Sequence, residues 1–277
     1  MRRREFVSAL GAFALAGSAG GLRRTHDRLD RIGLELYTVR QELERDFEGT
    51  LQRVAGLGYR EVEFTDYYGR SAEAVRAAVG TAGLIAPSAQ VPSSDLRAAS
   101  GDRIERAKAI GHSYLVCGWV PPAERRSLAD WRSLAALFNS VGQAAEQAGL
   151  QFAYHNHDFE FTPVEGRVPY DLLLEATDPA LMKLELDVYW ATKGGRDPVD
   201  LFARWPGRFH LLHLKDMAAG PRREFSELGR GIIDFRRILS QTKAAGVRHV
   251  FVEQDEGRAT PFERARIGYD YLRQLRF

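Results

Sequence analysis

Eight short apolar segments, each followed by a segment with helical spacing, constrain the fold of this chain more than any other feature. The apolar segments are residues 32–37, 61–64, 85–90, 114–117, 151–154, 182–188, 209–214 and 249–253. Helices are expected at 47–57, 72–79, 103–110, 127–148, 170–176, 198–205, 233–245 and 261–275. A repeated strand and helix predicts a parallel sheet covered by helices. Eight repeats predict a closed (β/α)8 TIM barrel, which typically needs about 250 residues.

An open, doubly wound sheet is the other α/β arrangement that such a repeat can form. That fold places a glycine-rich phosphate loop after its first strand. Here the first strand is followed by Thr38-Val39-Arg40-Gln41, which contains no glycine. The closed barrel is therefore the expected fold class.

The N-terminal segment has the pattern of an export signal. Arg3 and Arg4 precede a short, mildly apolar run that ends among small residues, as in secretory signals. Paired arginines before a bulky apolar residue resemble a twin-arginine signal; the alternative is a short amphipathic helix. We expect residues 1–29 to be an export signal and linker, residues 30–277 to form a single barrel domain, and the mature protein to be periplasmic.

Charge and hydropathy exclude several classes of partner. The formal net charge is +2, and the leader residues Arg2 to Glu5 account for it, so the barrel itself is neutral and a poor polyanion binder. No basic stripe with interleaved aromatic residues is present, and no run approaches the roughly 18 apolar residues of a membrane span. We expect a small-molecule partner, no nucleic acid and no integral membrane span, and the sequence leaves homo-oligomer formation open. Cys117 is the only cysteine, which excludes an internal disulfide and a cysteine metal cage.

Side chains that bind metals gather at the ends of the last four predicted strands. Residues 154–161, Tyr-His-Asn-His-Asp-Phe-Glu-Phe, contain two histidines and two carboxylates directly after the fifth strand. The carboxyl ends of barrel strands converge at one mouth, so the end residues of these strands should meet there. We expect one divalent ion, Mn, Mg, Co, Fe or Zn, bound by Glu160, Asp187, His213 and Glu253.

Together these motifs resemble the sugar phosphate isomerase/epimerase family, the xylose-isomerase-like TIM barrels. The resemblance rests on residues 154–161, 186–190, 213–216 and 252–255 and covers about residues 31–277. It implies a (β/α)8 barrel, one divalent metal, and a sugar, keto-sugar or inositol-like polyol as substrate. It also implies the same four ligands at the ends of strands five to eight. Relatives that act on free ketoses have a glutamate where this chain has His155, so His155 or His157 can replace Glu160 as the fourth ligand.

The chemistry expected from this resemblance is proton abstraction next to a carbonyl. The carbonyl and a neighbouring hydroxyl of the sugar would chelate the metal, which stabilises an enediolate. Glu253 and either Glu160 or His155 would act as base and acid on opposite faces of the substrate, and His157 is a further catalytic candidate. Proton return gives an isomerase or epimerase, which we expect. Loss of a β-substituent gives the alternative, a dehydratase or lyase acting on a keto-glycoside or inosose.

Five other residues are candidates for substrate binding. Lys215 and Arg40 can hold substrate oxygens, whereas Trp119, Trp190 and Tyr37 at predicted strand ends can stack on a sugar face. Glu35 and Glu63, inside early strands, are second-rank candidates for polar groups of the barrel interior. Export favours an unphosphorylated substrate, because phosphorylated sugars are mostly cytoplasmic.

Two other functions compete with this one. The first is an endonuclease of the related barrel superfamily, which needs more histidine ligands and a basic groove, and neither is evident in the sequence. The second is a non-catalytic exported sugar-binding barrel, which has no need of a metal with flanking bases.

Overall fold

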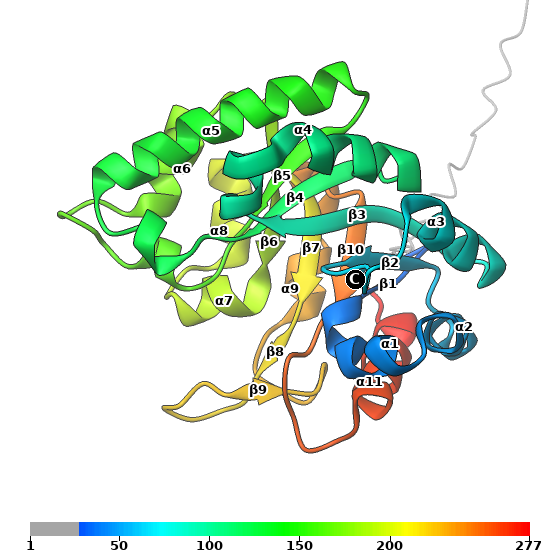
Figure 1. Ribbon diagram of the computed structural model, residues 1–277. Coiled ribbons are helices and arrows are strands. Elements are labelled where there is room, and N and C mark those ends of the chain that lie inside the picture. Colours follow the sequence, from blue (N-terminus) through cyan, green and yellow to red (C-terminus); the bar gives the residue numbers. More distant parts are fainter. Residues whose placement is uncertain (1–27) are drawn as a thin grey trace, which may run out of the picture.

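The computed structural model describes residues 28–277, which form a closed barrel of parallel strands surrounded by helices (Figure 1). The strands are joined around the barrel in the order β1, β10, β7, β6, β5, β4, β3 and β2. Their bounds are β1 (Gly33–Glu35), β2 (Glu61–Phe64), β3 (Ile85–Pro92), β4 (Tyr114–Trp119), β5 (Gln151–His155), β6 (Met182–Asp187), β7 (Phe209–Leu214) and β10 (His249–Val252). The predicted (β/α)8 TIM barrel is therefore confirmed. The predicted export signal and linker lie outside the described residues, except for residues 28 and 29.

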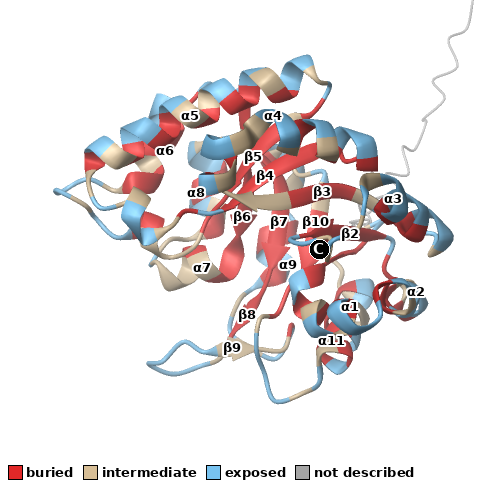
Figure 2. Cartoon of the chain, viewed as in Figure 1, coloured by how far each residue is buried: buried red, intermediate tan, exposed pale blue. Residues whose placement is uncertain are grey.

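The helices cover the outside of the barrel and turn their buried faces toward the strands (Figure 2). None of those described is long and apolar enough to cross a membrane. Their bounds are α1 (Arg40–Arg45), α2 (Phe47–Leu57), α3 (Ala72–Thr81), α4 (Ser93–Ile110), α5 (Leu128–Gln147), α6 (Pro169–Ala176), α7 (Val188–Lys193), α8 (Pro198–Arg204), α9 (Phe235–Leu239), α10 (Thr242–Ala245) and α11 (Pro261–Gln274), with short 3-10 turns η1 (Leu36–Val39), η2 (Pro122–Glu124) and η3 (Phe159–Phe161).

Several helix bounds differ from the predicted ones for local reasons. The predicted helix at 103–110 is the second half of α4, which begins at Ser93 and has non-helical dihedral angles at Ala99. The predicted helix at 233–245 is two short helices, α9 and α10. The sixth strand ends at Asp187, one residue earlier than predicted, because the Asp187 side chain accepts a hydrogen bond from the backbone of Trp190 and caps α7. The sequence patterns predicted neither α1 nor α7.

A hairpin of two short strands, β8 (Asp216–Met217) and β9 (Phe225–Ser226), follows β7 and extends beyond the barrel (Figure 1). The buried carboxylate of Asp216 accepts hydrogen bonds from the backbone N–H groups of Gly229, Gly231 and Ile233, at 2.8–3.2 Å. These hydrogen bonds hold the start of β8 against residues 229–233, which follow β9. The sequence patterns did not predict this hairpin, which brings Phe225 to the mouth of the barrel.

Strand alternation divides the core into an outer and an inner layer. Tyr154 of β5 packs outward on Phe138 of α5, with ring centroids 5.2 Å apart. The neighbouring residue Ala153 belongs to a separate inner cluster, together with Tyr114, Val116, Leu211 and Phe251. Because side chains alternate along a strand, His155 lies on the same inner face as Ala153. The inner cluster therefore closes the barrel beneath the polar residues of the mouth.

Gly33 on β1 tests the packing of this inner layer. A Cβ atom at this position would lie 2.4 Å from Cδ1 of Phe251 and 3.0 Å from the carbonyl oxygen of Val250. We expect Gly33→Ala to lower the free energy of unfolding by about 1–3 kcal/mol, as overpacking does, measured by chemical denaturation. Gly56→Ala in α2, where a Cβ meets nothing within 4 Å, should leave stability unchanged or raise it by about 0.5–1 kcal/mol. Equal effects of the two substitutions would contradict this account of the barrel interior.

Candidate functional site

A cavity of about 900 Å³ opens at the carboxyl ends of the barrel strands. The five predicted substrate-binding residues, Tyr37, Arg40, Trp119, Trp190 and Lys215, all line it. So do three of the predicted catalytic residues, His155, His157 and Glu253, whereas Glu160 is not among the lining residues. The remaining lining residues are Glu35, Gln41, Glu44, Thr65, Asp66, Tyr68, Gln90, Gly118, Phe225, Asp255 and Glu256.

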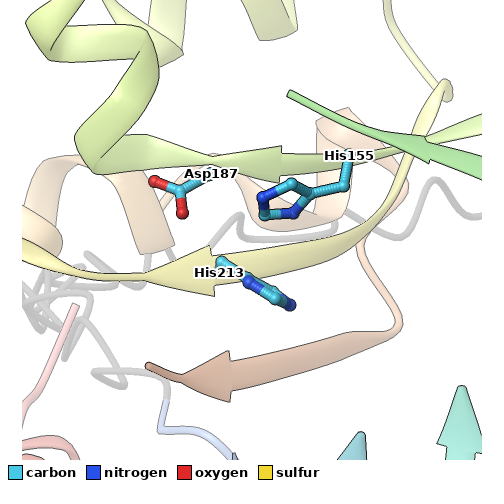
Figure 3. Close-up of side chains that lie close together, drawn as sticks. All are labelled: His155, Asp187 and His213. Atoms are coloured by element: carbon cyan, nitrogen blue, oxygen red, sulfur yellow. The ribbon is translucent and has the colours of Figure 1, made fainter. Parts of the chain in front are cut away.

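Three buried side chains on neighbouring strands converge below this cavity. His155 of β5, Asp187 of β6 and His213 of β7 each offer a ligand atom, and these atoms all lie within 4.8 Å of one another (Figure 3). The strand register sets this geometry, because Asp187 pairs with His213 across β6 and β7. The three residues form a group that is able to hold a metal ion.

Asp187 uses its two carboxylate oxygens differently. Oδ1 accepts a hydrogen bond of 2.9 Å from the backbone of Trp190 at the start of α7. Oδ2 is buried and accepts no hydrogen bond, although Nζ of Lys215 lies 3.3 Å away. The buried side chain of Asn156 accepts a hydrogen bond from the backbone N–H of Asp187 at 3.1 Å. One oxygen is thus fixed by the fold, and the other is available to a cation.

His155 is oriented by a carboxylate behind it. Its Nδ1 lies 3.1 Å from Oε2 of Glu185, which leaves Nε2 as the nitrogen available to a metal. Burial lowers the pKa of His155 well below its ordinary value, so the imidazole is neutral, the form that binds metals. A carboxylate that fixes the second nitrogen of a ligand histidine is the usual support of a metal site.

His213 lies between carboxylates on both of its ring nitrogens. Nδ1 is 2.6 Å from Oε2 of Glu253, and Nε2 is 2.8 Å from Oε1 of Glu63 and 3.3 Å from Oε2 of Glu185. Burial alone lowers the pKa of His213, but the three carboxylates together raise it well above the ordinary value. Glu63, Glu185 and His213 form a second group with ligand atoms within 4.8 Å of one another, sharing His213 with the first.

Glu253 is held by two cationic neighbours. Nζ of Lys215 lies 2.8 Å from Oε1 of Glu253 and 3.2 Å from Oδ1 of Asp255. Although burial raises the pKa of Glu253, the ammonium of Lys215 and the imidazole of His213 lower it well below the usual range. Glu253 is therefore an ionised carboxylate at the floor of the cavity.

Glu160 lies apart from this cluster. Its Oε1 accepts a hydrogen bond of 2.6 Å from the hydroxyl of Tyr154, and its Oε2 accepts one of 2.9 Å from the backbone N–H of His157. Tyr154 belongs to the outer core layer, so these contacts fasten the loop after β5 to the outside of the strand. Glu160 does not belong to either of the groups of converging ligand atoms in residues 28–277.

Two residues that the sequence analysis did not select complete the cluster, the half-buried Gln90 and the buried Glu185. Nε2 of Gln90 donates to Oε1 of Glu63 at 2.8 Å and to Oε2 of Glu185 at 3.0 Å. Glu185 was detectable in principle, because it lies two residues before Asp187 on one strand and so on the same face. Gln90 follows Pro87 in the least regular of the strand patterns, and no sequence signal indicated its role.

The donor set fits a divalent metal ion. Imidazole nitrogens from His155 and His213 with a carboxylate oxygen from Asp187 suit ions from manganese to zinc, and a bound ion would displace the proton that the neighbouring carboxylates hold on His213. Oδ2 of Asp187 accepts no hydrogen bond from the described residues and has the ammonium of Lys215 nearby, at 3.3 Å, so its lone pairs are available to such an ion. Of the four predicted ligands, Asp187 and His213 lie in one group of converging ligand atoms with His155, whereas Glu253 contacts His213 but, like Glu160, belongs to neither group found in residues 28–277. The ligand set itself stays a prediction.

The buried position of Glu160 leads to a pH-dependent stability. Burial raises the pKa of Glu160 from its ordinary value of 4.5 to about 8, against the opposing effect of its hydrogen bonds. The folded state therefore keeps this proton to higher pH than the unfolded state, so stability present below pH 4.5 is lost as pH rises toward 8. Glutamine does not titrate, so the Glu160→Gln variant does not lose this stability as pH rises. Without metal, we therefore expect the free energy of unfolding of the variant minus that of the parent to increase across this range, by at most about 1.4 kcal/mol per pH unit.

Urea denaturation in the presence of a chelator at several pH values measures this difference. Glu105→Gln, on the exposed face of α4, controls for the removal of one carboxylate. A Glu160→Gln effect that stays constant between pH 5 and 8 would show that Glu160 is ionised in the folded protein.

Comparisons with known proteins agree with this architecture. The chain is 30% identical over 162 residues to the inosose dehydratase of Lacticaseibacillus casei, a match that covers 52% of this chain and 54% of that relative. The chain thus spans about half the length of this relative. A longer match, 25% identical over 270 residues, covers 83% of the chain and 90% of the inosose dehydratase of Clostridium botulinum.

A solved structure and a family model extend the comparison to most of the chain. The crystal structure of a sugar phosphate isomerase/epimerase from Parabacteroides distasonis matches with a TM-score of 0.75 and 28% identity, covering 88% of this chain and 93% of that one. The family model described as xylose isomerase-like TIM barrel matches residues 51–275. The chain therefore belongs to the xylose isomerase-like TIM barrel family.

Proposed function

We propose that this chain is a divalent-metal-dependent enzyme that removes a proton next to the carbonyl of a keto-sugar or related polyol, and that elimination of a β-substituent follows. The observation that carries this proposal is the convergence of His155, Asp187 and His213 beneath one open cavity. A buried site of this kind beside an ionised carboxylate suits carbon acid chemistry.

Each residue near the site has a distinct part in this chemistry. A metal held by His155, Asp187 and His213 would polarise the substrate carbonyl and acidify the neighbouring C–H bond. Glu253, kept ionised by Lys215, is the base that takes the proton. Lys215, which lines the cavity, holds this base in place through its contacts with Asp187, Glu253 and Asp255.

Elimination follows from that proton loss without an oxidant or reductant. The electron pair of the broken C–H bond becomes a carbon–carbon double bond, and the bond to the β-oxygen breaks. The leaving oxygen takes a proton from water. The proton removed from carbon rests on Glu253, and every atom and electron is thus accounted for.

The opposite wall of the cavity favours elimination over epimerisation. An epimerase needs a second group that returns the proton to the other face of the substrate. Across the barrel from Glu253, the lining residues on the β5 side are His155 and His157. Burial lowers the pKa of His157 to about 3, and both imidazoles are neutral, so neither holds a proton for easy delivery. Elimination needs only one base, and the relatives named inosose dehydratase support this choice.

The second candidate is an isomerase or epimerase with the same metal site. The Parabacteroides distasonis relative, whose name is sugar phosphate isomerase/epimerase, is 28% identical and favours it. We also propose that the mature protein is periplasmic, on the basis of the twin-arginine-like pattern of residues 1–29.

Elemental analysis tests the metal. We expect about one Mn, Fe, Co or Zn ion per purified chain, because imidazole ligands disfavour Mg. Asp187→Ala, His213→Ala and His155→Ala should each lose the ion, whereas Glu160→Gln should retain it. No metal in the parent after reloading with each ion would refute the proposed site. Loss in Glu160→Gln with retention in His155→Ala would instead assign the fourth ligand to Glu160.

Incubation of candidate keto-sugars and inososes in deuterated solvent tests the reaction. We expect exchange of the hydrogen next to the carbonyl and a product whose mass is lower by the leaving group. Glu253→Gln, assayed with saturating metal and with its metal content measured, should slow exchange by about 10²- to 10⁴-fold. Exchange with a product of unchanged mass would establish the epimerase or isomerase instead. Absence of exchange with every substrate would refute proton abstraction.

A further inference from the structure

The cavity has two chemically different walls. One wall is a continuous row of aromatic side chains, which we call the aromatic arc: Trp119 at the end of β4, His157 after β5, Trp190 in α7 and Phe225 in β9. Successive ring centroids along it are 5.0, 5.4 and 5.7 Å apart. All four side chains line the same cavity.

The other wall is acidic. Its carboxylates, which we call the acidic arc, come from the end of β1, from α1 and from the segments after β2 and β10, and they are Glu35, Glu44, Asp66, Glu253, Asp255 and Glu256. The only lysine or arginine side chains among the lining residues are Lys215 and Arg40. The fixed charges of the cavity lining are therefore mostly negative.

The two cations of the lining are held differently. Lys215 is surrounded by Asp187, Glu253 and Asp255 at 2.8–3.3 Å. The guanidinium of Arg40 lies 4.0 Å from the ring centroid of Tyr37, and its Nη1 donates to the backbone oxygens of Tyr37 and Asp255, so Arg40 is the lining cation that has no carboxylate partner among residues 28–277. Away from the metal-binding group, a phosphate on the substrate would thus meet more carboxylates than cations.

The cavity extends outward from the metal-binding group to exposed aromatic rings. His155 lies at its floor, and His157 begins the aromatic arc two residues later. At the rim, Trp119 is 42% exposed, and Tyr37 across the mouth is 40% exposed. A volume of about 900 Å³ is at the upper end for cavities that hold drug-sized ligands, so one sugar ring at the floor leaves the rim region unfilled.

From these features we propose that the cavity binds neutral glycosides, with one sugar ring at the metal-binding group and a second ring against Trp119 and Tyr37, and that it disfavours phosphorylated sugars. Aromatic faces suit the apolar C–H faces of sugars and aglycones, and carboxylates accept hydrogen bonds from their hydroxyl groups. This inference rests on the proposed function for the identity of the inner ring. It narrows the substrate class to uncharged glycosides with a second ring.

Calorimetric titration of the metal-loaded protein tests the inference with three probes: methyl glucoside, phenyl glucoside and glucose 6-phosphate. We expect phenyl glucoside to bind at least tenfold more tightly than methyl glucoside, and glucose 6-phosphate to bind most weakly. Trp119→Ala should remove the advantage of the phenyl group, so that the two neutral glucosides bind equally. Ile85→Ala, an exposed apolar side chain outside the cavity, is the matched control and should change neither.

The acidic arc has its own test. Glu44→Gln combined with Asp66→Asn removes two rim carboxylates without changing the size of the side chains. The double substitution should reduce the difference in affinity between methyl glucoside and glucose 6-phosphate. Added salt should reduce the same difference in affinity in the parent protein, since screening weakens the interaction between exposed charges.

Three outcomes would overturn the inference: glucose 6-phosphate binding as tightly as the neutral probes, no advantage for the phenyl group, or no measurable binding of either neutral glucoside. None of these titrations requires turnover. If the neutral glucosides bind as expected but no keto-sugar exchanges hydrogen with solvent, the proposed reaction is refuted and this inference stands. If a sugar phosphate exchanges hydrogen and also binds more tightly than the neutral glucosides, this inference is refuted and the proposed reaction stands.

Discussion

The burial of carboxylates inside the barrel is the constraint on which the rest of the site depends. Glu63, Glu185 and Asp187 are fully buried, and Glu253 is 6% exposed. Ionised groups removed from water are destabilising unless they are paired. His213 and Lys215 supply that pairing, each surrounded by three carboxylates, and a divalent ion would add the positive charge that these two residues do not provide.

The fold meets this constraint by strand register rather than by flexible loops. Inward positions on β5, β6 and β7 carry His155, Asp187 and His213, so rigid strands fix the spacing of the metal-binding group. The supporting contacts are equally local. Asp187 caps α7 with one oxygen and keeps the other available, and Glu185 on the same strand orients His155. Such support is what holds ligands in a productive arrangement.

Chemistry and specificity occupy different depths of the same cavity. The inner groups are those that the proposed proton abstraction requires. The outer groups come from the loops after the strands and from the β8–β9 hairpin, which Asp216 holds in place. Loops at the carboxyl ends of barrel strands are where members of this fold differ. The aromatic and acidic arcs lie at this same end of the barrel.

Periodicity alone determined the barrel, because strand and helix repeats depend on local residue order. It also brought Asp187, His213 and Glu253 to one mouth, since strand ends converge in any parallel barrel. Tertiary structure decided the rest. Only packing shows that Tyr154 and the backbone of His157 bind Glu160 outside the lumen, while strand alternation turns His155 inward. Only closure of the barrel joins Glu63 of β2 to His213 of β7, because residues 150 positions apart meet through contacts that no local pattern encodes.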